Sequence, residues 1–90
     1  MNIQAVVHEY IVENHLRGEY SGAFGDTTPL ISSGIIDSIG VLDLVNFIES
    51  RFEIEFMPRE IGPQNLETVQ QIQLAIQKKL DLKRGASSNS

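Results

Sequence analysis

Ser38, set between Asp37 and Ile39, is the side chain of this 90-residue chain that is best placed to take part in chemistry. Apolar residues recur at helical spacing directly after it, so Ser38 lies at the start of a predicted helix. The short side-chain oxygen of Asp37 or of Ser38 suits a helix N-cap, because it can accept a hydrogen bond from the first turn. The positive end of the helix dipole also favours a phosphate attached at this point. The residues alone therefore leave two roles open for Ser38, an attachment point and an ordinary N-cap.

Other reactive side chains do not suggest a catalytic or metal site. His8 and His15 are seven positions apart in the first predicted helix, so they could share a face and act as metal ligands or general bases. No further ligand type clusters with them, so we interpret both as structural and predict no metal site. A hydrolase triad at Ser38 is not expected, because Asp37 is its direct neighbour and not an orienting partner of a histidine. The sequence thus predicts a protein that is not itself an enzyme.

Composition and charge limit the possible functions. The chain contains no cysteine, so any thiol chemistry has to arrive on a prosthetic group. Twelve acidic and seven basic residues give a net charge of −5, which disfavours nucleic-acid binding and favours partners with basic patches. We expect no secretory signal and no membrane span, and therefore a cytoplasmic location. The length predicts a single domain with one core, and we expect a monomer.

Three segments have the periodicity of amphipathic helices. They are residues 2–16, residues 38 to about 52, and a last helix that begins after Thr68. Thr68 and Gln71 form a predicted capping box, in which the Gln71 side chain reaches back to the N-cap. The positions expected to face the core are Ile3, Val6, Val7, Tyr10, Ile11, Val41, Leu44, Val45, Ile48, Phe52, Val69, Ile72, Ile76 and Leu80.

The connections between these helices have their own patterns. Residues 19–36 form a long glycine-rich loop, which apolar side chains within it can anchor to the helices. Residues 53–56 alternate between charged and apolar types, but the run is too short and isolated for a sheet, so we expect an extended link. Pro58 then opens a short helical turn, which Gly62 and Pro63 end.

The triplet Asp37-Ser38-Ile39, its helix and the following Phe52-Glu53-Ile54-Glu55-Phe56 run together resemble the acyl and peptidyl carrier proteins over roughly residues 2 to 80. The resemblance implies an all-α fold, a four-helix bundle of the acyl-carrier type with a long first loop and a short third helix. It also implies that Ser38 carries a 4′-phosphopantetheine arm derived from coenzyme A. On this basis we expect a carrier domain over residues 1–82 and a disordered polar tail over residues 83–90.

The resemblance also assigns expected contacts for partner enzymes. Turning about 100° per residue places Ile39, Asp43, Asn46 and Ser50 on one outward strip of the helix that begins at Ser38. Fewer acids lie on this strip than the family usually has there, which puts a fatty-acid-synthase partner in doubt. The residues expected to bind partners are Asp37, Ile39, Asp43, Asn46, Glu49 and Ile61. Those that could line an acyl pocket, or simply fill the core, are Phe56, Ile61 and Leu66.

The expected function is that of a free-standing carrier of acyl or aminoacyl groups, bound as thioesters, in a specialised lipid or natural-product pathway. Its expected partners are a phosphopantetheinyl transferase, an acyl- or aminoacyl-loading ligase and downstream biosynthetic enzymes. An aminoacyl, D-alanyl or peptidyl carrier is an alternative within the family. A helical interaction module that lacks the arm is the alternative outside it. The sequence leaves the cargo and the pathway open.

Overall fold

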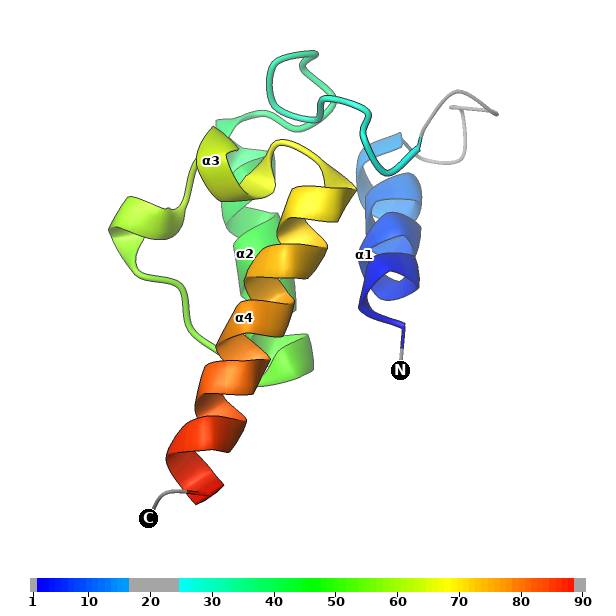
Figure 1. Ribbon diagram of the computed structural model, residues 1–90. Coiled ribbons are helices and arrows are strands. Elements are labelled where there is room, and N and C mark those ends of the chain that lie inside the picture. Colours follow the sequence, from blue (N-terminus) through cyan, green and yellow to red (C-terminus); the bar gives the residue numbers. More distant parts are fainter. Residues whose placement is uncertain (1, 17–24, 89–90) are drawn as a thin grey trace.

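The computed structural model of this chain describes residues 2–16 and 25–88, and every regular element in these ranges is helical. In chain order the elements are α1 (Ile3–Ile11), the π-helical turn η1 (Val12–Leu16), α2 (Ser38–Phe52), the 3-10 turn η2 (Pro58–Glu60), α3 (Pro63–Leu66) and α4 (Val69–Ser88). Helix α4 packs against α1, α2 and α3 (Figure 1). The all-α, four-helix prediction is confirmed for the described residues.

The core is built from the apolar faces of α1, α2 and α4. Residues four positions apart on α1 are buried because they lie one above another on one side of the helix. Full burial of a Leu, Ile or Val side chain stabilises the fold by about 1.5–3 kcal/mol. The side chains of these three helices that are buried are Ile3, Val7, Ile11, Leu44, Val45, Ile48, Phe52, Val69, Ile72 and Ile76. The remaining predicted core residues, Val6, Tyr10, Val41 and Leu80, are half-buried against the same cluster.

The first loop is held against the start of α4 over its described part, residues 25–37. Leu30 and Ile36 are buried, as expected of apolar anchors within the loop. Glu67, which the sequence analysis did not single out, fixes the same loop through both its main chain and its side chain. Its carbonyl oxygen accepts a hydrogen bond from Leu30 N at 2.7 Å, and its carboxylate accepts from Ile31 N at 2.7 Å and Ser32 N at 3.0 Å. The loop is therefore anchored a few residues before the start of α2.

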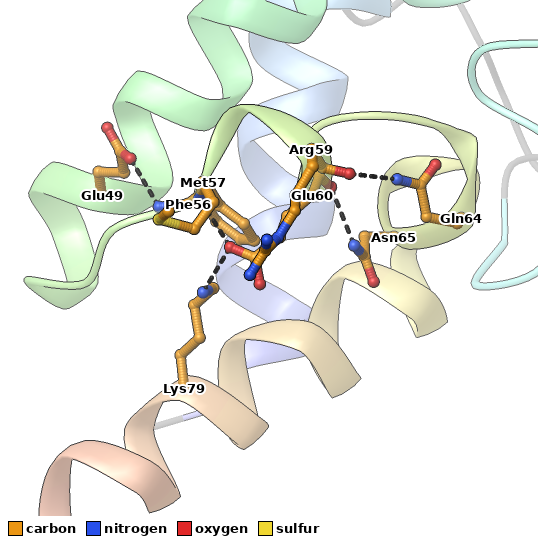
Figure 2. A network of polar contacts seen from close by, with 8 residues as sticks. All are labelled: Glu49, Phe56, Met57, Arg59, Glu60, Gln64, Asn65 and Lys79. Carbon is orange, nitrogen blue, oxygen red and sulfur yellow. Dashed lines mark hydrogen bonds and ion pairs between the residues drawn. The ribbon is translucent and has the colours of Figure 1, made fainter.

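The segment after α2, residues 53–62, contacts both α2 and α4 (Figure 2). Its first part contains no regular element at residues 54–57, in agreement with the extended link predicted over residues 53–56. Ile54 and Phe56 point into the core, and Glu53 ends α2 in the left-handed region at φ 56°. The backbone N–H of Phe56 donates to a Glu49 carboxylate oxygen at 2.9 Å, and the Lys79 ammonium pairs with Glu60 at 2.8 Å. The segment is thus fixed to both helices.

The short helical region after this link differs from the prediction. Pro58 does begin a turn, but Pro63, expected to end it, instead occupies the first position of a second short helix, α3. A proline suits that position because its missing N–H has no partner within the helix. Gly62 before it has an extended backbone, which separates the two turns.

The start of α4 shows one of the two hydrogen bonds of the predicted capping box. The backbone N–H of Gln71 donates to Thr68 Oγ1 at 3.1 Å, so Thr68 is an N-cap. The Gln71 side-chain oxygen is buried and has no hydrogen-bond partner among the described residues, so the second half of the predicted capping box is wrong.

At its other end, α4 continues to Ser88, so residues 83–88 are helical where the sequence predicted a disordered tail. Lys83, Arg84 and Ala86 are good helix formers, whereas Gly85 and the two serines are not. The stretch extends a helix that is already nucleated by its packed first turns, so each added residue needs only propagation. The division of the chain at residue 82 stays a prediction. None of the helices in the described part is long and apolar enough to cross a membrane.

Candidate functional site

The first turn of α2 is the structural setting of Ser38. Asp37 is the N-cap, and its Oδ1 accepts a hydrogen bond from Gly40 N at 2.7 Å. The Asp37 carbonyl accepts the first helical bond, from Val41 N at 2.9 Å. Ser38 is the first helical residue and is exposed. Asp37 therefore caps the helix, and Ser38 does not have the N-cap role that the sequence left open for it.

Gly40 allows the start of α2 to pack closely against the rest of the protein. A Cβ atom at this position would lie 2.9 Å from Ile36 Cγ2, 3.0 Å from His15 Cε1 and 3.2 Å from Asp37 Oδ1. Real Cβ atoms essentially never come within 3.0 Å of another heavy atom, and distances of 3.0–3.4 Å are tighter than nine in ten real contacts, so a larger residue here would force its neighbours to shift. The small size of Gly40 is what lets η1 and the loop meet the first turn.

His15 lies at this contact, beside the start of α2, although it is distant from Ser38 in sequence. The π-helical turn η1 carries it, and its ring meets Tyr10 edge-on at 5.6 Å between centroids. Its Nε2 atom is buried and has no hydrogen-bond partner among the described residues. Burial lowers the pKa of His15, while the negative charges of Asp43 and Asp37 act in the opposite direction. Sequence spacing gave no signal for this contact, because a π turn changes the face on which a side chain lies.

Within the described residues, no three side chains of the His, Cys, Asp and Glu types gather closely enough to hold a metal ion. His8 and His15 lie on different elements, α1 and η1, and only His15 meets the start of α2. The group that the first turn of α2 offers for chemistry is therefore the exposed Ser38 hydroxyl beside the helix N-terminus.

Comparison with known proteins gives the family. No family model matches the chain. A probable acyl carrier protein, PigG, of Serratia sp. (strain ATCC 39006) is 30% identical over 76 residues, which make up 84% of this chain and 86% of that protein. The chain belongs to the acyl carrier protein family. As a member of this family it is a carrier, and this confirms the resemblance on which the fold and the role of the protein were predicted.

A solved structure has the same fold. A chain in a crystal structure described as that of an FAD-dependent dehydrogenase superposes with a TM-score of 0.70 and 26% sequence identity. The match covers 78% of this carrier protein and 97% of that chain. That chain therefore has the same helical fold as this one.

Three of the predicted partner-binding residues of this acyl carrier protein share an exposed strip of α2. Ile39 is 71% exposed, and Asp43 and Asn46 are also exposed. Leu42, which the sequence analysis did not select, is 55% exposed and lies one turn after Ser38. The strip therefore presents more apolar surface near the serine than predicted.

The other predicted partner-binding residues lie elsewhere or have a second role. Asp37 is exposed but caps α2. Glu49 is half-buried and accepts the hydrogen bond from Phe56 N, so it holds the 53–62 segment in place. Ile61 is half-buried against the core. A contact of these three residues with partners stays a prediction.

The three residues named for an acyl pocket are not gathered around one hollow. Phe56 and Leu66 are buried in the core, and Ile61 packs beside them. Phe56 also borders a hollow of about 180 Å³ that opens toward α4, with Ala75 and Lys79 on its other side, and neither Ile61 nor Leu66 lines it. An acyl pocket formed by Phe56, Ile61 and Leu66 stays a prediction.

Proposed function

We propose that this acyl carrier protein bears a 4′-phosphopantetheine arm on Ser38 and carries acyl groups on it as thioesters. The observation that carries the proposal is the exposed Ser38 at the first position of α2, whose capping is done by Asp37. Membership of the family supports the same role.

The residues present fit such an arm. Ser38 is exposed, so its hydroxyl can accept a substituent without loss of core packing. A phosphodiester on this hydroxyl would lie at the positive end of α2, where negative charge is stabilised by about 0.3–1 kcal/mol at an exposed site. When bound, the arm supplies the thiol that the cysteine-free chain lacks.

Attachment requires little chemistry from the chain itself. The Ser38 oxygen attacks a phosphorus atom of the coenzyme A pyrophosphate, an O–P bond forms, and the P–O bond to the nucleotide half breaks. The serine proton passes to a base of the phosphopantetheinyl transferase, and the nucleotide leaves as 3′,5′-ADP. The carrier contributes a rigid first turn that holds the oxygen in an accessible place, which reduces the entropy lost in reaching the reactive geometry.

We propose an acyl cargo, since the curated relative is named as a probable acyl carrier protein. An aminoacyl, D-alanyl or peptidyl cargo is the alternative, and loading of the protein bearing the arm by acyl and aminoacyl ligases distinguishes these classes. A specialised lipid or natural-product pathway is part of the same proposal. The alternative outside the carrier function, an interaction module without an arm, is distinguished by the mass measurement below.

We further propose that an FAD-dependent dehydrogenase is one of the downstream partners. The similar solved chain is shorter than the present one, since 78% of these 90 residues corresponds to 97% of it. A chain of this size is too short for a dinucleotide-binding dehydrogenase domain, so we infer that it accompanies a flavoprotein in that structure. In the proposed reaction a hydride passes from the cargo to the flavin, and a proton passes from the cargo to a base of the dehydrogenase. The loss of both leaves a double bond in the cargo.

The test of the arm is intact-mass spectrometry after incubation with coenzyme A, Mg²⁺ and a broad-specificity phosphopantetheinyl transferase. We expect one phosphopantetheine adduct on the wild type, none on S38A, and one on S50A, whose serine is exposed on the same helix. No adduct on the wild type, under conditions that modify a known carrier protein, would contradict the proposal and favour the interaction module.

The dehydrogenase partner is tested by flavin absorbance. The flavin of a purified FAD-dependent acyl dehydrogenase should be bleached by the acyl-loaded carrier and not by the same acyl group on free pantetheine. Equal bleaching by both substrates would show that the protein part is not recognised and would contradict this partner.

A further inference from the structure

A groove separates α1 and η1 from α2 on the side of the protein away from the 53–62 segment. It has a volume of about 490 Å³, and its lining includes Glu9 and Tyr10 of α1, Glu13 of η1, and Phe47 and Arg51 of α2. We call this hollow the α1–α2 groove. Neither the predicted partner-binding residues nor the predicted acyl pocket includes any of these side chains.

The floor of the α1–α2 groove contains an aromatic pair. The rings of Tyr10 and Phe47 are stacked, with centroids 4.1 Å apart and planes 14° from parallel. Both residues are only half-buried, so part of the pair borders the groove. The stacking covers the inner face of each ring, so the pair offers the groove an apolar surface against which the alkyl stem of a long side chain can pack.

The walls of the groove differ in charge. Glu9 and Glu13 are exposed, lie four residues apart on the same side, and form no salt bridge within the described part of the chain. Arg51 lies on the opposite wall, where its guanidinium is 5.7 Å from the centre of the Phe52 ring. Two carboxylates and one guanidinium thus line the hollow, so negative charge is in excess and a positive group is favoured beside the glutamates.

The groove adjoins the exposed strip of α2. Asp43 is one helical turn before Phe47, and its charge acts on Tyr10, where burial and Asp43 together raise the pKa of the phenol. A partner seated on Ile39 and Asp43 thus meets the groove on the α1 side of the same surface.

The glutamates of the groove also add acidic groups near the exposed strip of α2, which has few of its own. The strip of α2 has Asn46 and Ser50 where acids were expected, and Glu49 is engaged by Phe56 N. Exposed carboxylates that could steer a basic partner toward Ser38 are therefore supplied by α1 and η1 as well as by Asp43.

We propose that the α1–α2 groove receives an arginine or lysine side chain of the transferase that modifies Ser38, with its charge beside Glu9 and Glu13 and its stem over Tyr10 and Phe47. The two exposed carboxylates select a positive charge, and the apolar aromatic pair suits the alkyl stem of an arginine or lysine. This inference rests on the proposed function, because it places the partner that acts on Ser38.

The test compares two double variants that lose the same charge from different faces. E9Q/E13Q neutralises the groove, and E53Q/E55Q neutralises two exposed acids of the 53–62 segment. The rate of Ser38 modification is measured against carrier concentration with the broad-specificity transferase. We expect E9Q/E13Q to raise KM about three- to tenfold at low salt with kcat unchanged, and E53Q/E55Q to stay within about twofold of the wild type.

A third variant changes the groove in the opposite sense. R51Q removes the cation from the far wall, so it should lower KM, and its effect and that of E9Q/E13Q should both shrink at high ionic strength. Circular dichroism of all variants should match the wild type, since the changed side chains are exposed.

The possible outcomes separate the two proposals. A wild type that is modified, with an unchanged KM in E9Q/E13Q, would overturn the groove proposal and leave the assignment of Ser38 intact. An equal rise of KM in both double variants would overturn it too, because net charge alone would then explain the effect. A wild type that is not modified at all would remove both proposals.

Discussion

At the scale of residues, the start of α2 divides two tasks between neighbouring side chains. Asp37 satisfies the first turn through Gly40 N, and Ser38 is exposed beside it. If the hydroxyl of Ser38 were also the cap, attachment of a large group to it would remove a hydrogen bond from the helix. The observed arrangement separates the stability of α2 from the chemical state of Ser38.

This separation predicts different stabilities for two adjacent alanine variants. D37A should lower the free energy of unfolding by about 1 kcal/mol, the usual loss for an N-cap. S38A should change it by less than about 0.5 kcal/mol, as expected for an exposed residue without such a role. Urea unfolding followed by circular dichroism measures both, and a larger loss in S38A than in D37A would contradict the assignment of the cap.

His15 predicts a dependence of stability on pH. Its pKa in the folded protein is lowered, mainly by burial, from the value of about 6.5 expected in the unfolded chain. The unfolded state therefore takes up the proton first as the pH falls. The stabilising contribution is fully present above about pH 6.5 and is lost as the pH falls through the lowered pKa of the folded state.

The measurement is thermal unfolding between about pH 7.5 and pH 5, a range above the ordinary pKa of the acids. The wild type should lose stability over this range, and H15N should lose less, with H8N as the matched histidine control. Glu60, whose pKa is lowered mainly by its hydrogen bond to Lys79, adds a loss only at more acidic pH. Parallel curves for the wild type and H15N would contradict the role given to the burial of His15.

At the scale of elements, the loop before α2 is held by hydrogen bonds to the junction of α3 and α4. Glu67, at the junction of α3 and α4, accepts hydrogen bonds from Ile31 N and Ser32 N, and its carbonyl accepts one from Leu30 N. The loop leads directly into Asp37 and Ser38. The position of the serine thus depends on a residue about thirty positions later in the sequence.

Removal of this carboxylate should loosen the loop. E67A should lower the free energy of unfolding by about 1–3 kcal/mol, because two backbone N–H groups lose a charged acceptor. Hydrogen exchange of the Ile31 and Ser32 amides should become faster, whereas amides in the middle of α4 should be affected only through the global stability. E55A, which removes an exposed acid, is the control. Unchanged exchange at Ile31 and Ser32 would contradict this positioning role.

Much of the helical structure could be predicted from periodicity. The buried face of α2 follows directly from the spacing of Leu44, Ile48 and Phe52, because a long run of apolar residues at this spacing fits an α-helix and not a strand. The clamp by Glu67 and the contact of His15 with Gly40 could not be predicted. Both depend on pairs far apart in sequence, for which one sequence carries no local signal. A short third helix was predicted, but it was placed at the turn that follows Pro58. Helix α3 instead begins at Pro63, because a proline has the same appearance at the end of one turn and at the start of another.

At the scale of the whole molecule, the exposed strip of α2 and the α1–α2 groove lie next to each other, while the 53–62 segment is fixed on another side by Glu49 and Lys79 (Figure 2). The site itself was predictable only in part. Ser38, Ile39 and Asp43 are exposed on α2, and their roles stay predictions. The position of Glu9 and Glu13 at the groove could not be predicted, because it depends on how α1 lies beside α2.

The central claim is that Ser38 is the residue that bears the arm, and tandem mass spectrometry of the modified protein tests it most directly. After treatment with coenzyme A and the transferase, the account predicts that the peptide containing Ser38 carries phosphopantetheine and releases a pantetheine fragment on collision. An unmodified Ser38 peptide from protein that is folded by circular dichroism, or an adduct located on another serine, would contradict it.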